Sequence, residues 1–145
     1  MLQSDQYCDI RKPDEAGRLA LTWASRCGHD KTVETLLDWG ADVNLQGGDH
    51  GNALYIASEW GHEKVVEVLL ERGADVDAPG ANDDTALYAA SWTGHEKIAE
   101  LLLNNRADVN SRGKHYGSAL NSAARYGEER VAKLLLDRGA SPNLK

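Results

Sequence analysis

Histidine is the residue type in this chain whose spacing most directly suggests chemistry, since its ring binds metals and transfers protons. His29, His62 and His95 are separated by 33 residues each. If that period is structural, successive copies lie roughly 10 Å apart, a helix-packing distance, whereas zinc–nitrogen bonds are about 2 Å long. The three rings therefore cannot share one ion. We predict no metal and no cofactor, and we expect these histidines to cap the start of a helix.

The remaining histidines do not form a catalytic arrangement. His50 follows Asp49 in a turn-rich segment, and His115 precedes Tyr116 in another. Neither has an evident nucleophile beside it in the sequence. Phosphate-loop, GxSxG and HExxH motifs are absent. The sequence thus favours binding over catalysis, and we assign no catalytic residue.

The elements that position these residues repeat with the same period. Gly28, Gly61, Gly94 and Gly127 are spaced by 33 residues. Such a period is typical of stacked repeat proteins, which present an extended surface to a partner. The predicted units are unit one (14–46), unit two (47–79), unit three (80–112) and unit four (113–145), with a partial N-terminal repeat at 1–13.

Unit two shows the expected structure of every unit. Small residues and good helix formers predict a first helix over 53–60, which Gly61 ends. A second helix starts at His62 and carries an apolar stripe, and Gly73 supplies the turn after it. The stripe consists of Val65, Val66, Leu69 and Leu70. The prediction is an all-α solenoid of helix–turn–helix units.

These motifs resemble the ankyrin repeat. Gly-His after the first helix, paired leucines in the second and Gly-Ala-Asp after it recur in register, as in Gly73-Ala74-Asp75. The family's Thr-Pro-Leu-His element is altered, with alanine in place of proline in every unit, as at Ala53. The style of the array is similar to ankyrin domains of fungal NLR-type proteins. The resemblance implies an ankyrin solenoid that works as an intracellular protein–protein interaction module or scaffold.

Family architecture implies that a protein partner binds the concave face, where first helices end and turn tips project. The residues that we predict to bind there are Arg26, Glu59, Trp60, Tyr88, Trp92, Arg125 and Tyr126 near the helix ends, and Asp49, Asp84 and His115 at the tips. Trp60, Trp92 and Tyr126 would form an aromatic ladder with one rung per unit, since tryptophan and tyrosine anchor interfaces. Trp92 is expected to be exposed on this face.

A different class of function stays open at this stage. Tyr55, Trp60, Tyr88, Trp92 and His115 would line a concave pocket that binds a small molecule or supports catalysis. A deep pocket with converging tyrosine, histidine and carboxylate groups would favour this alternative. A shallow groove would favour protein binding.

Composition narrows the classes of partner. The formal net charge of −7 disfavours nucleic acid, which requires a basic face, and favours neutral or basic partners. Apolar runs are too short for a membrane span. Two cysteines, Cys8 and Cys27, fit a reducing compartment, in which disulfides are rare. We expect a cytoplasmic protein, with the nucleus not excluded.

Two local features break the pattern of the repeat. Unit four keeps its second helix apolar at Val131, Leu134 and Leu135, so we expect outward-facing apolar side chains there, and either further repeats or self-association through this end. Arg106 occupies the position where the other units have glycine. We predict that Arg106 adopts the left-handed conformation and carries strain.

Overall fold

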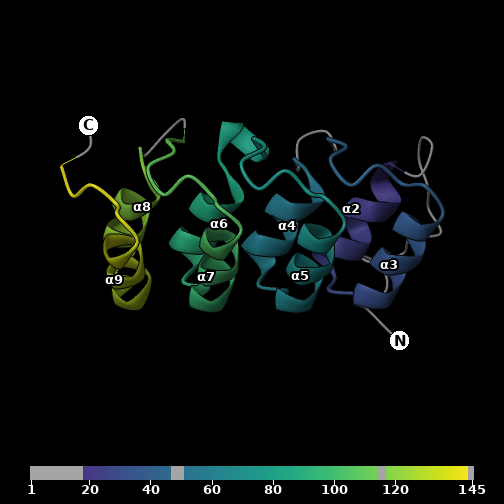
Figure 1. Ribbon diagram of the computed structural model, residues 1–145, viewed down its shortest axis with the longest axis horizontal. Coiled ribbons are helices and arrows are strands. Elements are labelled where there is room, and N and C mark those ends of the chain that lie inside the picture. The colour runs from purple at the N-terminus through teal and green to yellow at the C-terminus, as the bar shows by residue number, and fades with distance from the viewer. Residues whose placement is uncertain (1–17, 47–50, 114–116, 144–145) are drawn as a thin grey trace.

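The computed structural model describes residues 18–46, 51–113 and 117–143 (Figure 1). The described ranges contain eight α-helices: α2 (Arg18–Arg26), α3 (Asp30–Asp38), α4 (Ala53–Trp60), α5 (Glu63–Glu71), α6 (Ala86–Thr93), α7 (Glu96–Asn104), α8 (Ala119–Arg125) and α9 (Glu129–Asp137). A short 3-10 turn, η3 (Ala81–Asp83), precedes α6. The predicted partial repeat at 1–13 and the predicted site residues Asp49 and His115 lie outside these ranges.

Each first helix from α4 onward begins at a side-chain cap. Asn52 Oδ1 accepts a hydrogen bond of 2.8 Å from the backbone N–H of Tyr55, and Thr85 and Ser118 cap α6 and α8 in the same way. These caps satisfy N–H groups that have no partner within the helix. Gly61, at φ 80°, ends α4 in the left-handed conformation. The bounds predicted for the first helix of unit two are therefore confirmed, and the second helix begins at Glu63, one residue after the predicted start.

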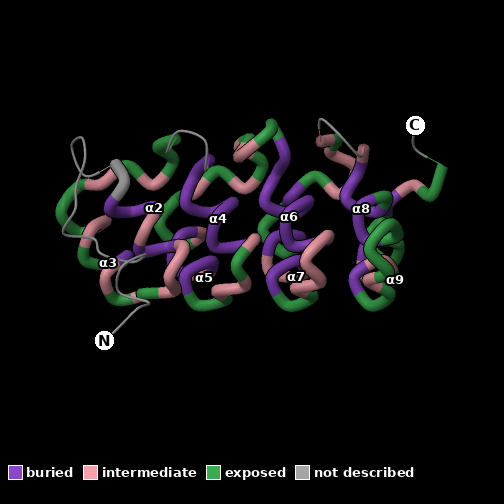
Figure 2. The backbone as a smooth tube through the Cα atoms, turned by 180° about the vertical axis from the view of Figure 1, so that it is seen from behind, coloured by how far each residue is buried: buried purple, intermediate pink, exposed green. Residues whose placement is uncertain are grey.

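The helices stack in two rows, with α2, α4, α6 and α8 in one and α3, α5, α7 and α9 in the other (Figure 1). Small side chains in the first row, such as Ala57 and Ser58 of α4, are fully buried and let neighbouring helices approach closely. Leucine and valine from the second row complete one continuous core, which runs along the whole stack in Figure 2. The predicted all-α solenoid is confirmed.

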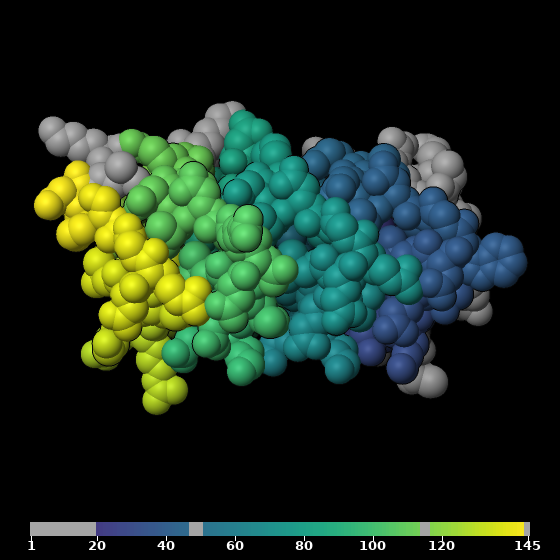
Figure 3. All heavy atoms as spheres, in the orientation of Figure 1, coloured from purple at the N-terminus to yellow at the C-terminus, as the bar shows by residue number. Residues whose placement is uncertain are grey.

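Hydrogen bonds between neighbouring units recur at fixed sequence intervals. Asn44 Oδ1 accepts a hydrogen bond of 2.7 Å from the backbone N–H of Asp75. Asp77, which lies 33 residues after Asn44, accepts a hydrogen bond of 3.0 Å from the backbone N–H of Asp108 through its Oδ1. On the second row, Arg72 donates to Asp38 at 2.7 Å. Each bond reaches only the adjacent unit. Figure 3 shows the successive units following one another along the long axis of the molecule.

His62 and His95 contact the preceding unit rather than cap helices through their side chains. His62 precedes α5 as predicted, but its side chain makes no capping hydrogen bond. Its Nε2 instead donates to the carbonyl of Arg26 at 2.8 Å. The ring also lies against Gly28 of the preceding unit, where an added Cβ would be 2.6 Å from Nδ1. The capping role expected from the sequence is wrong, because the ring faces the neighbouring unit.

Arg106 adopts the left-handed conformation that the sequence predicts, with φ 71°. Gly73 occupies the corresponding position of unit two at φ 92°. A residue with a Cβ loses about 1–2 kcal/mol in this region, whereas glycine does not. Unit three thus keeps the left-handed turn of unit two, although it has arginine in place of the glycine that adopts this conformation without strain.

Arg106→Gly should raise the free energy of unfolding by up to about 1 kcal/mol, since relief of strain exceeds the extra freedom of glycine in the unfolded chain. Urea unfolding midpoints of the two proteins measure the effect. Arg106→Ala is the control, because it keeps the Cβ and should leave stability within about 0.5 kcal/mol. A loss of stability in both variants would mean that the guanidinium group makes compensating contacts.

The last described unit differs from the expectation of an apolar outer face. Val131 and Leu135 are 1% and 0% exposed and belong to the core. Leu134 is partly buried against the same core. Leu136 is the large apolar side chain of α9 that reaches solvent, with 46% of its surface exposed. Val131 and Leu135, which the sequence indicated as outward-facing, therefore point inward, whereas Leu134 keeps part of its surface accessible.

Two further observations concern the environment of the chain. Cys27 is disulfide-bonded, which differs from the expectation drawn from a reducing compartment, and Cys8 lies outside the described residues. Among the described helices, none combines the length and the apolar character needed to cross a membrane.

Candidate functional site

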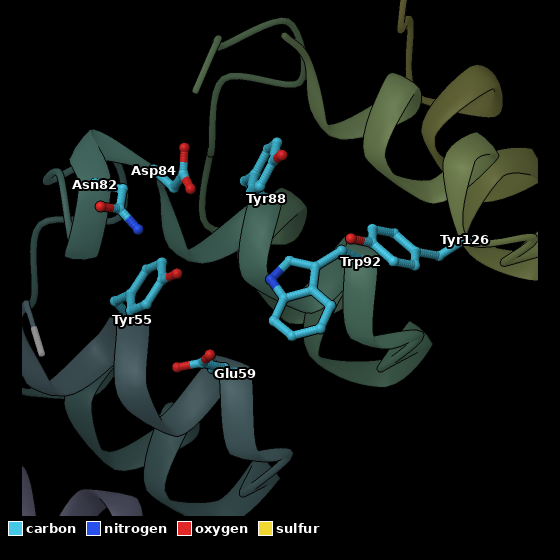
Figure 4. Close-up of a pocket in the computed structure, with 7 residues that line it drawn as sticks. All are labelled: Tyr55, Glu59, Asn82, Asp84, Tyr88, Trp92 and Tyr126. Atoms are coloured by element: carbon cyan, nitrogen blue, oxygen red, sulfur yellow. The ribbon is translucent and has the colours of Figure 1, made fainter. Parts of the chain in front are cut away.

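A pocket of about 220 Å³ lies where α4 and α6 meet the turn tip between units two and three (Figure 4). We call the surface formed by the ends of the first helices and the tips the inner face. The pocket is lined by Tyr55, Glu59, Asn82, Asp84, Tyr88, Trp92 and Tyr126. Residues of three successive units thus contribute to one concavity.

Helical spacing explains why α4 and α6 contribute matching pairs. Tyr55 and Glu59 are four residues apart on α4, so they lie on the same side of that helix. Tyr88 and Trp92 occupy the equivalent positions of α6, 33 residues later. The repeat therefore presents two similar helix surfaces side by side, which differ in that α6 has Trp92 where α4 has Glu59.

The turn tip closes the pocket from above. Asn82 and Asp83 both have positive φ, at 59° and 63°, a conformation that asparagine and aspartate tolerate better than most residues. This turn brings Asp84, which is only 6% exposed, to the wall of the pocket. Its carboxylate rests on Gly113, where an added Cβ would overlap Oδ1.

Glycine also makes room for Tyr55. An added Cβ on Gly80 would overlap the Tyr55 ring, so the tip can cover this ring only because residue 80 lacks a side chain. Tyr55 is consequently 5% exposed. Burial, followed by the negative charges of Glu59 and Asp84, raises the pKa of the Tyr55 hydroxyl far above its ordinary value. The phenol is thus neutral at physiological pH, and it lies in a negative electrostatic potential.

Aromatic and cationic side chains flank the pocket along the inner face. The Trp92 and Tyr126 rings pack with centroids 5.7 Å apart and an interplanar angle of 47°. The Cζ atom of Arg125 lies 5.7 Å from the centroid of the Tyr126 ring. At the other side, Arg26 lies 4.6 Å from the Trp60 ring centroid. The arrangement is two clusters rather than a ladder with one rung per unit.

The structure brings many of the predicted site residues together. Glu59, Asp84, Tyr88, Trp92 and Tyr126 line the pocket, and Arg26, Trp60 and Arg125 flank it. Trp92, which the sequence predicts to be exposed, is half-buried, and Tyr126 packs against its ring. Trp60 is 51% exposed.

Two pocket residues were not among the predicted partner-binding residues. Asn82 lines the pocket because of its left-handed backbone, which no sequence pattern indicates. Tyr55, which the sequence suggested only for the small-molecule alternative, shares its repeat position with Tyr88. That equivalence is the signal that could have identified it. In the described ranges, no group of three or more histidine, cysteine or acidic side chains is arranged to hold a metal ion.

Comparison with known proteins shows the family. The model of ankyrin repeats in three copies matches residues 45–113 and 78–145, and that of the single ankyrin repeat matches 16–48. The chain is 49% identical over 45 residues to the mouse protein described as DNA-binding protein RFXANK, and 44% identical over 45 residues to its human counterpart. Each match spans 31% of this chain and 17% of the relative. Because the family models together cover nearly all of the four units, the chain belongs to the ankyrin repeat family, whose members generally mediate protein–protein interaction.

Proposed function

We propose that the chain binds a segment of a partner protein on its inner face, with the pocket between α4 and α6 as the anchor point. The observation that carries the proposal is the convergence of aromatic rings and carboxylates from three successive units on one pocket. Pockets that receive an aromatic-rich contact and exclude water provide most of the energy of protein interfaces.

The rigidity of the pocket supports this function. Tyr55 and Tyr88 are 5% and 4% exposed, so their rings are already fixed before a partner arrives. Trp92 is held against Tyr126. A binding surface that is ordered in advance loses little entropy on association. Trp60, half exposed beside the pocket, would extend the contact along the inner face.

The size of the pocket argues against the small-molecule alternative. Its volume of about 220 Å³ is below the roughly 300–1,000 Å³ of typical small-molecule sites. The described lining residues supply phenols and carboxylates, and Trp60 lies outside the lining. A single side chain of a partner fits this volume better than a whole substrate does.

Nucleic acid is a less suitable ligand than protein. The relatives are described as DNA-binding proteins, but they match this chain over only 45 residues. The net charge here is −7, and phosphate binding requires lysine and arginine in excess. The acidic pocket would repel a phosphate backbone.

Selection of binders from a library of random 12-residue peptides tests the proposal. Peptides enriched on the wild-type chain should lose at least about 30-fold in affinity for Trp92→Ala/Tyr126→Ala, the ratio that about 2 kcal/mol of hot-spot energy gives. Fluorescence anisotropy of labelled peptides measures the dissociation constants.

Trp39→Ala is the matched control, because Trp39 is 86% exposed and follows α3 in the other row of helices. This variant should bind the selected peptides as the wild type does. Thermal unfolding of Trp92→Ala/Tyr126→Ala shows whether the two side chains act in binding or in the packing of the core. Normal binding together with early melting would show that Trp92 and Tyr126 are structural, and the proposal would then be wrong.

A further inference from the structure

Each internal junction of the stack joins the C-terminal side of one unit to the N-terminal side of the next. Between units two and three, Leu70 of α5 shares a groove with Leu101 and Asn105 of α7. At the first helices of the same junction, the ring of His95 occupies the space beside Gly61. The two sides of a junction are therefore different surfaces, and each fits the other.

The C-terminal side of unit four has the same apolar and glycine positions as that of unit two, but it is open to solvent. Leu136 is equivalent to Leu70 and is 46% exposed, whereas Leu103, at the same position of unit three, is 9% exposed. Ala124 is exposed, although the serines at its position in the earlier units are fully buried. No described atom lies within 4 Å of a Cβ added to Gly127. Apolar groups are accessible here, where terminal repeats usually have polar ones.

The N-terminal side of unit one, at the opposite end of the stack (Figure 1), is accessible as well. Trp39 occupies the repeat position of Asn105 and is 86% exposed, the largest fraction among the large apolar side chains that the structure describes. Thr35, one helical turn earlier, is also exposed. His29 occupies the position of His95 and is exposed, whereas His95 is partly buried in its junction. Both described ends of the stack thus present one side of a junction.

We propose that copies of this chain associate head to tail, with unit one of one copy stacked on unit four of another. The register of the repeat then places Trp39 of one copy over Leu136 of the other, because their equivalents line the groove between α5 and α7 together. His29 would enter the space beside Gly127, as its equivalent does in the junction between units two and three. The contact would bury two of the largest apolar side chains that this fold leaves exposed.

Polar groups of the two ends match in the same register. Asn143 holds the repeat position of Asn110, whose Oδ1 accepts a hydrogen bond of 3.0 Å from the backbone N–H of Ser141. Asp42 holds the position of Ser141. The backbone N–H of Asp42 would therefore donate to Asn143 Oδ1 of the other copy, so the contact supplies a polar bond of the kind that joins the internal units.

The wild-type chain should grow beyond a dimer as its concentration rises. A head-to-tail contact uses a different surface on each copy, so every complex keeps one free side at each end, and association continues unless a ring closes. Analytical ultracentrifugation between about 10 μM and 1 mM, the range in which weak contacts form, measures the average mass. We expect this mass to rise at least about twofold over the range.

Two variants that each block one end of the stack provide a sharper test. Leu136→Glu places a charge on the C-terminal side of unit four, and Trp39→Glu places one on the N-terminal side of unit one. Both residues are exposed, so the fold should persist, and circular dichroism checks it. Each variant alone should stay monomeric, because every contact needs both sides. An equimolar mixture should form a dimer and no larger species, since only one intact pair of sides remains.

Trp60→Glu is the matched control, because it makes the same kind of change at a half-exposed side chain of α4, away from both ends. It should associate as the wild type does. A wild-type chain that is monomeric up to about 1 mM would overturn the inference, and so would a mixture of the blocked variants that stays monomeric. Dimers of Trp39→Glu alone or of Leu136→Glu alone would show contacts between like sides and contradict head-to-tail stacking. The inner face takes no part, so these outcomes leave peptide binding untouched.

Discussion

Leu69→Ala should lower the free energy of unfolding by about 2–5 kcal/mol, the cost of removing a fully buried leucine and leaving a cavity. Leu69 is 0% exposed and lies in the continuous core. It belongs to a central unit, so its neighbours on both sides lose contacts. Denaturant unfolding followed by circular dichroism measures the change.

Leu136→Ala is the control for this prediction. Leu136 lies on α9 and is 46% exposed, so its truncation should cost less than about 1 kcal/mol. The two variants remove the same atoms from the same kind of helix. Equal losses would show that burial in the central units does not determine stability, contrary to the packing described above.

Gly61→Ala should destabilise the fold by about 2–5 kcal/mol for two reasons. Gly61 has φ 80°, where an alanine costs about 1–2 kcal/mol. Its new Cβ would also lie 2.6 Å from Cε1 of His95 in the next unit. Overpacking of this kind typically adds about 1–3 kcal/mol. Thermal and urea unfolding both measure the effect.

Gly127→Ala separates the two contributions. Gly127 has the same repeat position and φ 71°, but no described atom lies within 4 Å of its added Cβ. Only the backbone cost of about 1–2 kcal/mol should remain. The difference between the variants thus measures the histidine contact between units. If Gly127→Ala were as harmful as Gly61→Ala, the contact with His95 would contribute nothing.

The fold followed from the sequence because its signals are local and repeated. The 33-residue period, the glycine after each first helix and the leucine pairs fix where α4 and α5 begin and end. Even the exception was predictable, since Arg106 keeps a left-handed backbone that the period assigns to it. The inward direction of Val131 and Leu135 was missed, because apolar composition alone does not tell which side of a helix meets the core.

The site was less accessible to sequence reasoning because its geometry joins different units. Trp92 and Tyr126 occupy different repeat positions, yet their rings meet across the boundary between α6 and α8. The placement of Asn82 depends on two consecutive positive φ values. Tyr55 enters the pocket beneath a tip that only Gly80 allows to close. These features depend on contacts between different units and on local backbone conformation. A periodic sequence pattern does not specify either of them.

The hydrogen bonds described between units join only adjacent units. The number of units in the chain could therefore change independently of the residues that form the pocket. Loss of the whole segment 80–112 would bring Arg138 opposite Glu71, as Arg72 now lies opposite Asp38. Asp77 would then accept from the backbone N–H of the unit that follows, as it does now. The scaffold would survive such a deletion, but Asp84, Tyr88 and Trp92 would leave with the deleted segment. Gain or loss of complete units is therefore a route by which the chain can exchange what it recognises without rebuilding its core.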